Sequence, residues 1–307
     1  MIERQAILLR REIWEHRSIL LTPAVIALLV TLMAVTGHVA VSTYNQALDI
    51  AILGASNLGE AERSAAVGVL LTGIASLFAI SMWILTIFYA LDALYTERKD
   101  RSILFWRSIP CTDAETVVSK LLTAMLVIPV VTFVGIIVTH LAVLSVTSVW
   151  IEWRGANAWH LMWSATPFMD NWAATLVVLV ALPLWLSPFI GWFLFVSAFA
   201  KRSPFLVAFL PIVILPMLER TLLGSSLLAE ALFVRTGKLP LFRGLDTGDL
   251  LFYKGEEMAM SDVPTVSLLP LLDLSRFFGS PALWLGIVVC ALFTVAAVYV
   301  RRYRDDS

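Results

Sequence analysis

Residues 66–91 read AVGVLLTGIASLFAISMWILTIFYAL, and residues 92–120 follow as DALYTERKDRSILFWRSIPCTDAETVVSK. The first stretch carries no charged residue and is long enough to cross the roughly 30 Å hydrocarbon core of a bilayer as a helix. The second stretch is dense in charge, and it ends where another long apolar run begins. This alternation predicts an all-α membrane protein whose spans are joined by charged connections.

Composition extends the same interpretation to the whole chain. Of its 307 residues, 59% are apolar and only 15% are charged, whereas soluble domains carry about a quarter charged residues. The charges are segregated, which leaves six apolar runs near the length of a span. These predicted spans are Ile19–Val41, Ala66–Leu91, Val117–Val149, Trp172–Ala200, Phe205–Leu218 and Pro281–Val300.

Two of the predicted spans are irregular. The fourth contains Pro183 and Pro188, which predicts a kink because proline removes a backbone donor inside a helix. The fifth is short and contains two prolines. It is either a full span that extends to about Leu223 or a re-entrant segment.

Lysine and arginine side chains predict the orientation. Arg4, Lys120 and Arg301 belong to segments that six spans would place on one side of the membrane together with both termini, and those segments hold most of the basic residues of the short connections. We therefore expect a multi-pass membrane protein with both termini in the cytoplasm. Residues 1–17 form a predicted amphipathic helix, and residues 18–307 form a single transmembrane domain.

In the N-terminal helix, Ile2, Ala6, Leu9 and Ile13 recur at helical spacing, while Arg11 and Glu12 are among the charged residues that fill the rest. This pattern is typical of a helix that lies in the membrane interface with its apolar face toward the lipid. Such a helix either anchors the first span or also packs against a partner subunit. At the other side of the membrane, residues 220–280 form a large predicted extracytoplasmic segment with short helices.

Motifs for catalysis and nucleotide binding are missing from the sequence. It contains no GxxxxGK[ST] loop, no HExxH and no GxSxG pattern. The four histidines are scattered, and His140 within the third span is expected to be neutral and hydrogen-bonded rather than a proton relay. We therefore expect that the chain itself is not an enzyme, that it binds no cofactor or metal, and that no nucleic acid is a partner.

The charged connection, residues 92–120, is the strongest candidate for a functional segment. Phe105 and Trp106 lie together amid charge, a composition typical of a protein–protein contact. The helix should break at Pro110, and a new helix should begin with Thr112 or Asp113 as its N-cap. The alternative interpretation is a loop that lies on the membrane with Trp106 as its anchor.

This connection, from Glu97 to Pro110 and on through Thr112–Thr116 to Lys120, resembles the first cytoplasmic loop of bacterial ABC-2 type transporter permeases. The likeness covers about 25 residues as a motif, and the whole plan of an amphipathic helix, six spans and a large external segment is similar to that family. The resemblance implies that the loop is a coupling helix that docks on a separate ATPase. The implied coupling residues are Glu97, Arg98, Lys99, Asp100, Arg101, Leu104, Phe105, Trp106 and Arg107.

The same resemblance implies the location, which is the bacterial cytoplasmic (inner) membrane, and the partners and mechanism. Lys201 and Arg202, between the fourth and fifth spans, would form a second cytoplasmic contact. Two copies of an ABC ATPase would bind ATP and Mg²⁺, and the chain would pair with itself or with a second permease within membrane lipid. Alternating access would then move a substrate, expected to be hydrophobic or amphiphilic, outward. The competing function is a membrane scaffold or regulatory subunit that recruits a cytoplasmic partner without transport.

Overall fold

The computed structural model describes residues 2–43, 57–100, 111–164, 166–237, 239–242 and 269–303. Within these ranges every regular element is helical, and one isolated bridge joins Phe242 to Leu272. The helices are α1 (Ile2–Glu15), α2 (Ser18–Thr43), α4 (Glu60–Asp92), α5 (Tyr95–Lys99), α7 (Asp113–Leu122), η1 (Thr123–Val127), α8 (Ile128–Trp153), η2 (Trp159–Trp163), α9 (Phe168–Trp185), α10 (Ser187–Phe199), α11 (Pro204–Leu223), α12 (Leu227–Gly237), η3 (Leu269–Leu271), α14 (Leu274–Gly279) and α15 (Pro281–Tyr303).

Six helices of the described residues are long and apolar enough to cross a membrane. This finding agrees with the predicted all-α fold and indicates a multi-pass membrane protein. The fifth of them, α11, extends to Leu223. Its 20 residues favour a full span over a re-entrant segment, because a helix of this length rises about 30 Å.

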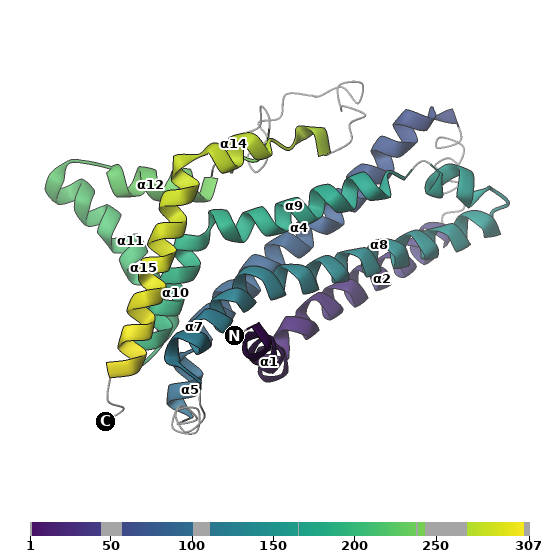
Figure 1. The fold of residues 1–307 in the computed structure, drawn as a ribbon. Coiled ribbons are helices and arrows are strands. Elements are labelled where there is room, and N and C mark those ends of the chain that lie inside the picture. The colour runs from purple at the N-terminus through teal and green to yellow at the C-terminus, as the bar shows by residue number, and fades with distance from the viewer. Residues whose placement is uncertain are drawn as a thin grey trace.

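The spans form two groups that diverge from a shared base (Figure 1). Helices α2, α4, α8 and α9 pack against one another in the first group, and α10, α11 and α15 form the second. Contacts between α4 and α10 join the groups, and α1 lies across the base beside α7. A large apolar core, which includes Phe78, Ile128 and Phe193, fills the junction.

The predicted fourth span is two helices rather than one kinked helix. Helix α9 ends at Trp185, and α10 begins at Ser187 after a single intervening residue, Leu186. Pro188 lies in the first turn of α10, where its missing N–H costs no helical hydrogen bond. The break frees α10 to pack along α15, and their backbones approach so closely that a Cβ on Gly191 would lie 2.9 Å from the Cα of Cys290.

The third span is one continuous helical segment, Asp113–Trp153, of 41 residues. At 1.5 Å per residue it is about 60 Å long, roughly twice the thickness of the hydrocarbon core. The π-helical turn η1 immediately precedes Pro129, and this turn accommodates a residue that cannot donate to the helical ladder. The great length means that the segment extends beyond the hydrocarbon core.

Candidate functional site: a buried ionic cluster

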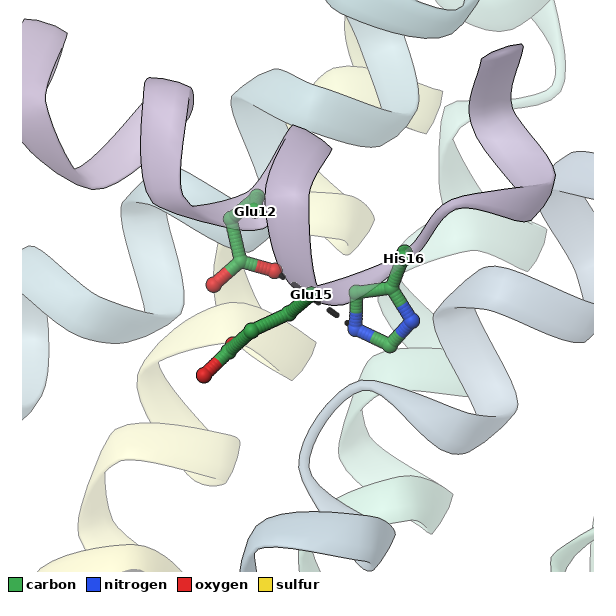
Figure 2. Close-up of side chains that lie close together, drawn as sticks. All are labelled: Glu12, Glu15 and His16. Atoms are coloured by element: carbon green, nitrogen blue, oxygen red, sulfur yellow. Dashed lines mark ion pairs between the residues drawn. The ribbon is translucent and has the colours of Figure 1, made fainter. Parts of the chain in front are cut away.

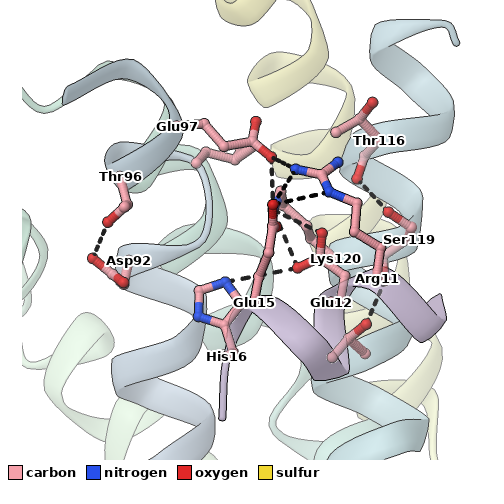
Figure 3. A network of polar contacts seen from close by, with 12 residues as sticks. Arg11, Glu12, Glu15, His16, Asp92, Thr96, Glu97, Thr116, Ser119 and Lys120 are labelled. Atoms are coloured by element: carbon pink, nitrogen blue, oxygen red, sulfur yellow. Dashed lines mark hydrogen bonds and ion pairs between the residues drawn. The ribbon is translucent and has the colours of Figure 1, made fainter. Parts of the chain in front are cut away.

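Charged side chains from four helices, together with a tyrosine hydroxyl from a fifth, meet at the base of the bundle, beside the connection between α5 and α7 (Figure 3). Glu12 enters from α1, and its carboxylate is 1% exposed. The ammonium of Lys120 in α7 donates to Glu12 Oε1 at 3.0 Å, and the hydroxyl of Tyr89 in α4 donates to Oε2 at 2.8 Å. One carboxylate therefore joins the N-terminal helix to the ends of two spans.

Glu97 of α5 is the second buried carboxylate of the cluster. Lys120 Nζ lies 3.0 Å from Glu97 Oε1, and Arg11 Nη2 lies 3.2 Å from the same oxygen. The other oxygen, Oε2, accepts a hydrogen bond from Arg301 Nη1 of α15. Three cations from three helices thus surround one side chain of a five-residue helix.

Arg301 closes the cluster on the side of the last span. Its Nε donates to Asp113 Oδ1 at 2.9 Å, so the same guanidinium joins α15 to the first residue of α7. We refer to Arg11, Glu12, Glu97, Asp113, Lys120 and Arg301 as the ionic cluster.

The buried centre of the ionic cluster is balanced in charge. Glu12 and Glu97 face Lys120 and Arg301, and all four are at most 6% exposed. Taking one ion out of water costs several kcal/mol, and a buried pair recovers this only when its charges and hydrogen bonds are satisfied. The distances here meet that condition, so removal of any one of these four charges leaves the buried centre unbalanced.

Helix α5 is also fixed to α10. The hydroxyl of Ser197 accepts hydrogen bonds from the backbone N–H groups of Leu94 and Tyr95, at 2.9 and 3.0 Å. Arg98 donates from Nη2 to the carbonyls of Ser197 and Ala200, both at 2.8 Å. These contacts satisfy carbonyls at the end of α10. Two consecutive residues therefore fix α5 to different helices, Glu97 to α1, α7 and α15 and Arg98 to α10.

The predicted coupling residues fall into three sets. Glu97 and Arg98 bind other helices of the same chain, and the burial of the Glu97 carboxylate leaves it little surface for another protein. Lys99 and Asp100 are exposed, as are Lys201 and Arg202 of the second predicted contact. Arg101, Leu104, Phe105, Trp106 and Arg107 lie outside the described residues. A role of these residues in contact with an ATPase stays a prediction.

The start of α7 confirms a prediction made from the sequence. The hydroxyl of Thr112 accepts from the N–H of Glu115 at 3.1 Å, while the Glu115 carboxylate accepts from the N–H of Thr112 at 2.9 Å. This reciprocal pair is a capping box. It begins the helix just before Asp113 and Lys120, and so sets the register that brings both residues into the ionic cluster.

The sequence interpretation missed Glu12 as a buried residue. We expected Glu12 among the polar residues of an interfacial helix, but α1 turns Leu8 and Glu12 toward the bundle and leaves Ile7 and Trp14 exposed. The burial of Glu12 was missed because its partners lie far away in the sequence, and Lys120 is 108 residues away. The one local signal was an acidic residue within a basic segment, Arg10-Arg11-Glu12.

Glu12, Glu15 and His16 also lie close enough together to hold a metal ion in principle (Figure 2). The Glu12 carboxylate, however, already accepts from the ammonium of Lys120 and the hydroxyl of Tyr89. A divalent cation would have to displace a bound lysine, so this arrangement favours an ion-pair role. Burial lowers the pKa of His16, against the opposing effect of Glu12, and this favours the neutral imidazole.

His140 occupies a separate position inside the first group of spans. Its Nδ1 accepts from the indole N–H of Trp172 at 3.2 Å, and its Nε2 lies 3.0 Å from the carbonyl oxygen of Leu71. Both contacts are satisfied by one neutral tautomer with the proton on Nε2. The geometry therefore agrees with the expectation of a hydrogen-bonded, neutral histidine.

Comparisons of the chain with protein-family models, with curated proteins and with solved structures found no match.

Proposed function

We propose that this protein is the transmembrane permease subunit of an ATP-binding cassette transporter, driven by a separate ATPase. The observation that carries the proposal is the ionic cluster on either side of the connection 101–110. Glu97 precedes that connection by four residues and Asp113 follows it by three, and Arg301 binds both side chains. A force on the connection would therefore reach the rest of the bundle through ionic contacts.

The cluster determines which helices would respond. Glu97 is linked through Arg11 and Lys120 to α1 and α7, and through Arg301 to α15. Arg98 adds α10, which packs along α15. Movement of α5 would thus be transmitted to both groups of spans, as alternating access requires.

Supply of energy by another chain accords with the absence of a P-loop from the sequence. In this proposal two ATPase copies bind ATP and Mg²⁺, and the N-terminal helix α1 lies in the cytoplasmic interface. Lys99, Asp100, Lys201 and Arg202 are exposed at the base and would be available to the ATPase. The permease pairs with itself or with a second permease, and it exports a hydrophobic or amphiphilic substrate across the bacterial inner membrane.

The test begins with an ATPase encoded beside this chain and co-expressed with it. We expect the double variant Phe105→Ala and Trp106→Ala to reach the membrane normally but to lose most of the ATPase that co-purifies. A matched control removes two exposed aromatic side chains from other parts of the chain, Trp153→Ala at the end of α8 and Phe278→Ala in α14, and should keep the ATPase bound.

A second variant separates binding from transmission. Lys120→Met removes a cation that no solvent reaches, so the ATPase should still bind while its coupling to transport is lost. Retention of the ATPase by the Phe105 and Trp106 variant, with transport unchanged, overturns the proposal. Binding of an ATPase with no ATP-dependent transport of any lipid or drug would instead favour the scaffold.

A further inference from the structure

An apolar cleft of about 640 Å³ lies between α10, α11, α12 and α15, in the second group of spans. This volume is within the usual range for sites that bind small molecules. Its walls are nearly all apolar, and they include Phe189, Trp192, Ile212, Val289 and Phe293.

Arg235 of α12 is the charged residue among those that line the cleft. Its guanidinium carbon lies 4.2 Å from the ring centroid of Trp185, and Nη1 donates to the carbonyl of Ala282 at 2.6 Å. The indole of Trp185 donates in turn to the backbone carbonyl of Arg235 at 2.8 Å. These contacts hold the side chain against the end of α9 and the first turn of α15.

Gly286 provides the space that the guanidinium occupies. A Cβ at this position would lie 1.6 Å from Arg235 Nη2, so any other residue would displace the arginine. The site for the cation is therefore built by residues of three helices and does not arise from a side chain lying on the surface.

The charge of Arg235 is not balanced within the described residues. No ion pair joins it to a carboxylate there, and its Nε and Nη2 atoms are buried without a hydrogen-bond acceptor. The side chain as a whole is half-buried, but polar atoms shielded from water are normally hydrogen-bonded, because an unpaired one loses its hydration without compensation. An anion is the group that this site lacks.

We propose that the cleft binds a membrane lipid with an acidic headgroup, whose phosphate lies against Arg235 and whose acyl chain lies along the apolar walls. The lipid can enter from the bilayer, because α11 exposes Leu210, Val213 and Met217 beside the wall it contributes to the cleft. Helix α12 also exposes Leu227 and Phe233, which suits a helix at the level where headgroups begin. A small shift of the guanidinium then gives its free N–H groups to the phosphate.

This inference does not depend on the proposed function, since lipid binding needs neither the ATPase nor transport. The test uses the purified protein in phosphatidylcholine nanodiscs. The probes are phosphatidic acid and phosphatidylcholine with the same diazirine-bearing acyl chains, and mass spectrometry maps the crosslinks. We expect phosphatidic acid to label α10, α11 and α15 in the cleft about tenfold more than phosphatidylcholine, a ratio that one charged hydrogen bond supports.

The variant Arg235→Gln should reduce labelling by phosphatidic acid to the level of phosphatidylcholine. Arg220→Gln removes an exposed cation from the end of α11 and should leave the tenfold preference unchanged. If Arg235→Gln does not fold, Gly286→Ala displaces the same guanidinium and should have the same effect. Equal labelling of the native protein by the two probes overturns the proposal, as does displacement of phosphatidic acid by millimolar inorganic phosphate.

Discussion

Helix α15 has an arginine contact at each of its ends, one with a buried side chain and one with a half-buried side chain. Arg301 binds two carboxylates, Glu97 and Asp113, whereas Arg235 packs against the start of α15 with no carboxylate partner among the described residues. The positions of Gly286 and Arg301 along the helix are separated by about 22 Å. One end has its charges paired and is suited to a mechanical link, and the other has no anion among the described residues and is suited to a ligand.

The largest effect should come from opening the complete end. Lys120→Met leaves Glu12 and Glu97 buried with one cation fewer, and loss of one partner from a buried pair costs about 3–5 kcal/mol. The free energy of unfolding, measured by SDS titration with tryptophan fluorescence, should fall by that amount. Lys201→Met, which removes an exposed lysine, should change it by less than about 0.5 kcal/mol. Equal effects of the two variants would show that the cluster adds no stability.

The middle of α15 packs closely against α10, and a substitution in α10 at this contact should have the next largest effect. Gly191→Ala places a Cβ 2.9 Å from the Cα of Cys290, and backbone atoms cannot move aside as a flexible side chain can. We expect a loss of about 1–3 kcal/mol in the same measurement. Gly73→Ala is the matched control, because nothing lies within 4 Å of its new Cβ. That variant should be neutral or more stable by up to about 1 kcal/mol.

The incomplete end should respond much less to loss of its cation. Arg235→Met gives up a cation–π contact and one hydrogen bond, but it also removes a charge without a counter-ion. The two effects offset each other, so stability in lipid-free detergent should stay within about 1 kcal/mol of the native protein. A loss as large as that of Lys120→Met would mean that Arg235 has a strong partner within the chain, and the comparison would fail.

The smallest expected effect is on the pH dependence of stability, and it comes from His16, which lies beside Glu12 of the ionic cluster. Burial lowers the pKa of His16 below 6.5 in the folded protein. The unfolded chain therefore takes up its proton first, and stability is lost as the pH falls below 6.5. His16→Gln should reduce the loss of stability between pH 6.5 and 5 relative to the native protein. An unchanged pH dependence would show that His16 is equally easy to protonate in both states.

Much of the fold could be predicted because the signals are local. Long apolar runs identify the spans, and the Thr112–Glu115 pair identifies the start of α7. The division of the fourth span at Leu186 was less visible, because Pro183 and Pro188 predicted a kink but did not distinguish it from a break. The break depends on packing, since α10 changes direction to lie against α15 through Gly191.

The sequence predicted where in the chain the candidate site lies, but not which residues its side chains contact. Glu97 and Arg98 were identified as functional by their place in the charged connection, but their contacts are with α1, α7, α10 and α15 rather than with solvent. Arg301 looked like one of the basic residues that flank a span, and nothing near it in the sequence indicates that it meets a carboxylate 204 residues away. Arg235 was one of several charges in a long external segment, and its contacts with Trp185 and Ala282 could not be inferred.

The sequence by itself determined that the chain is helical, that it passes the membrane several times, and where most of its helices begin. These properties follow from hydrophobicity, proline and capping residues, which act over a few neighbouring positions. Only the tertiary structure decided which charges are buried and which of them are paired. Pairing depends on side chains from distant helices meeting within about 3 Å, and that distance is set by the packing of the whole bundle.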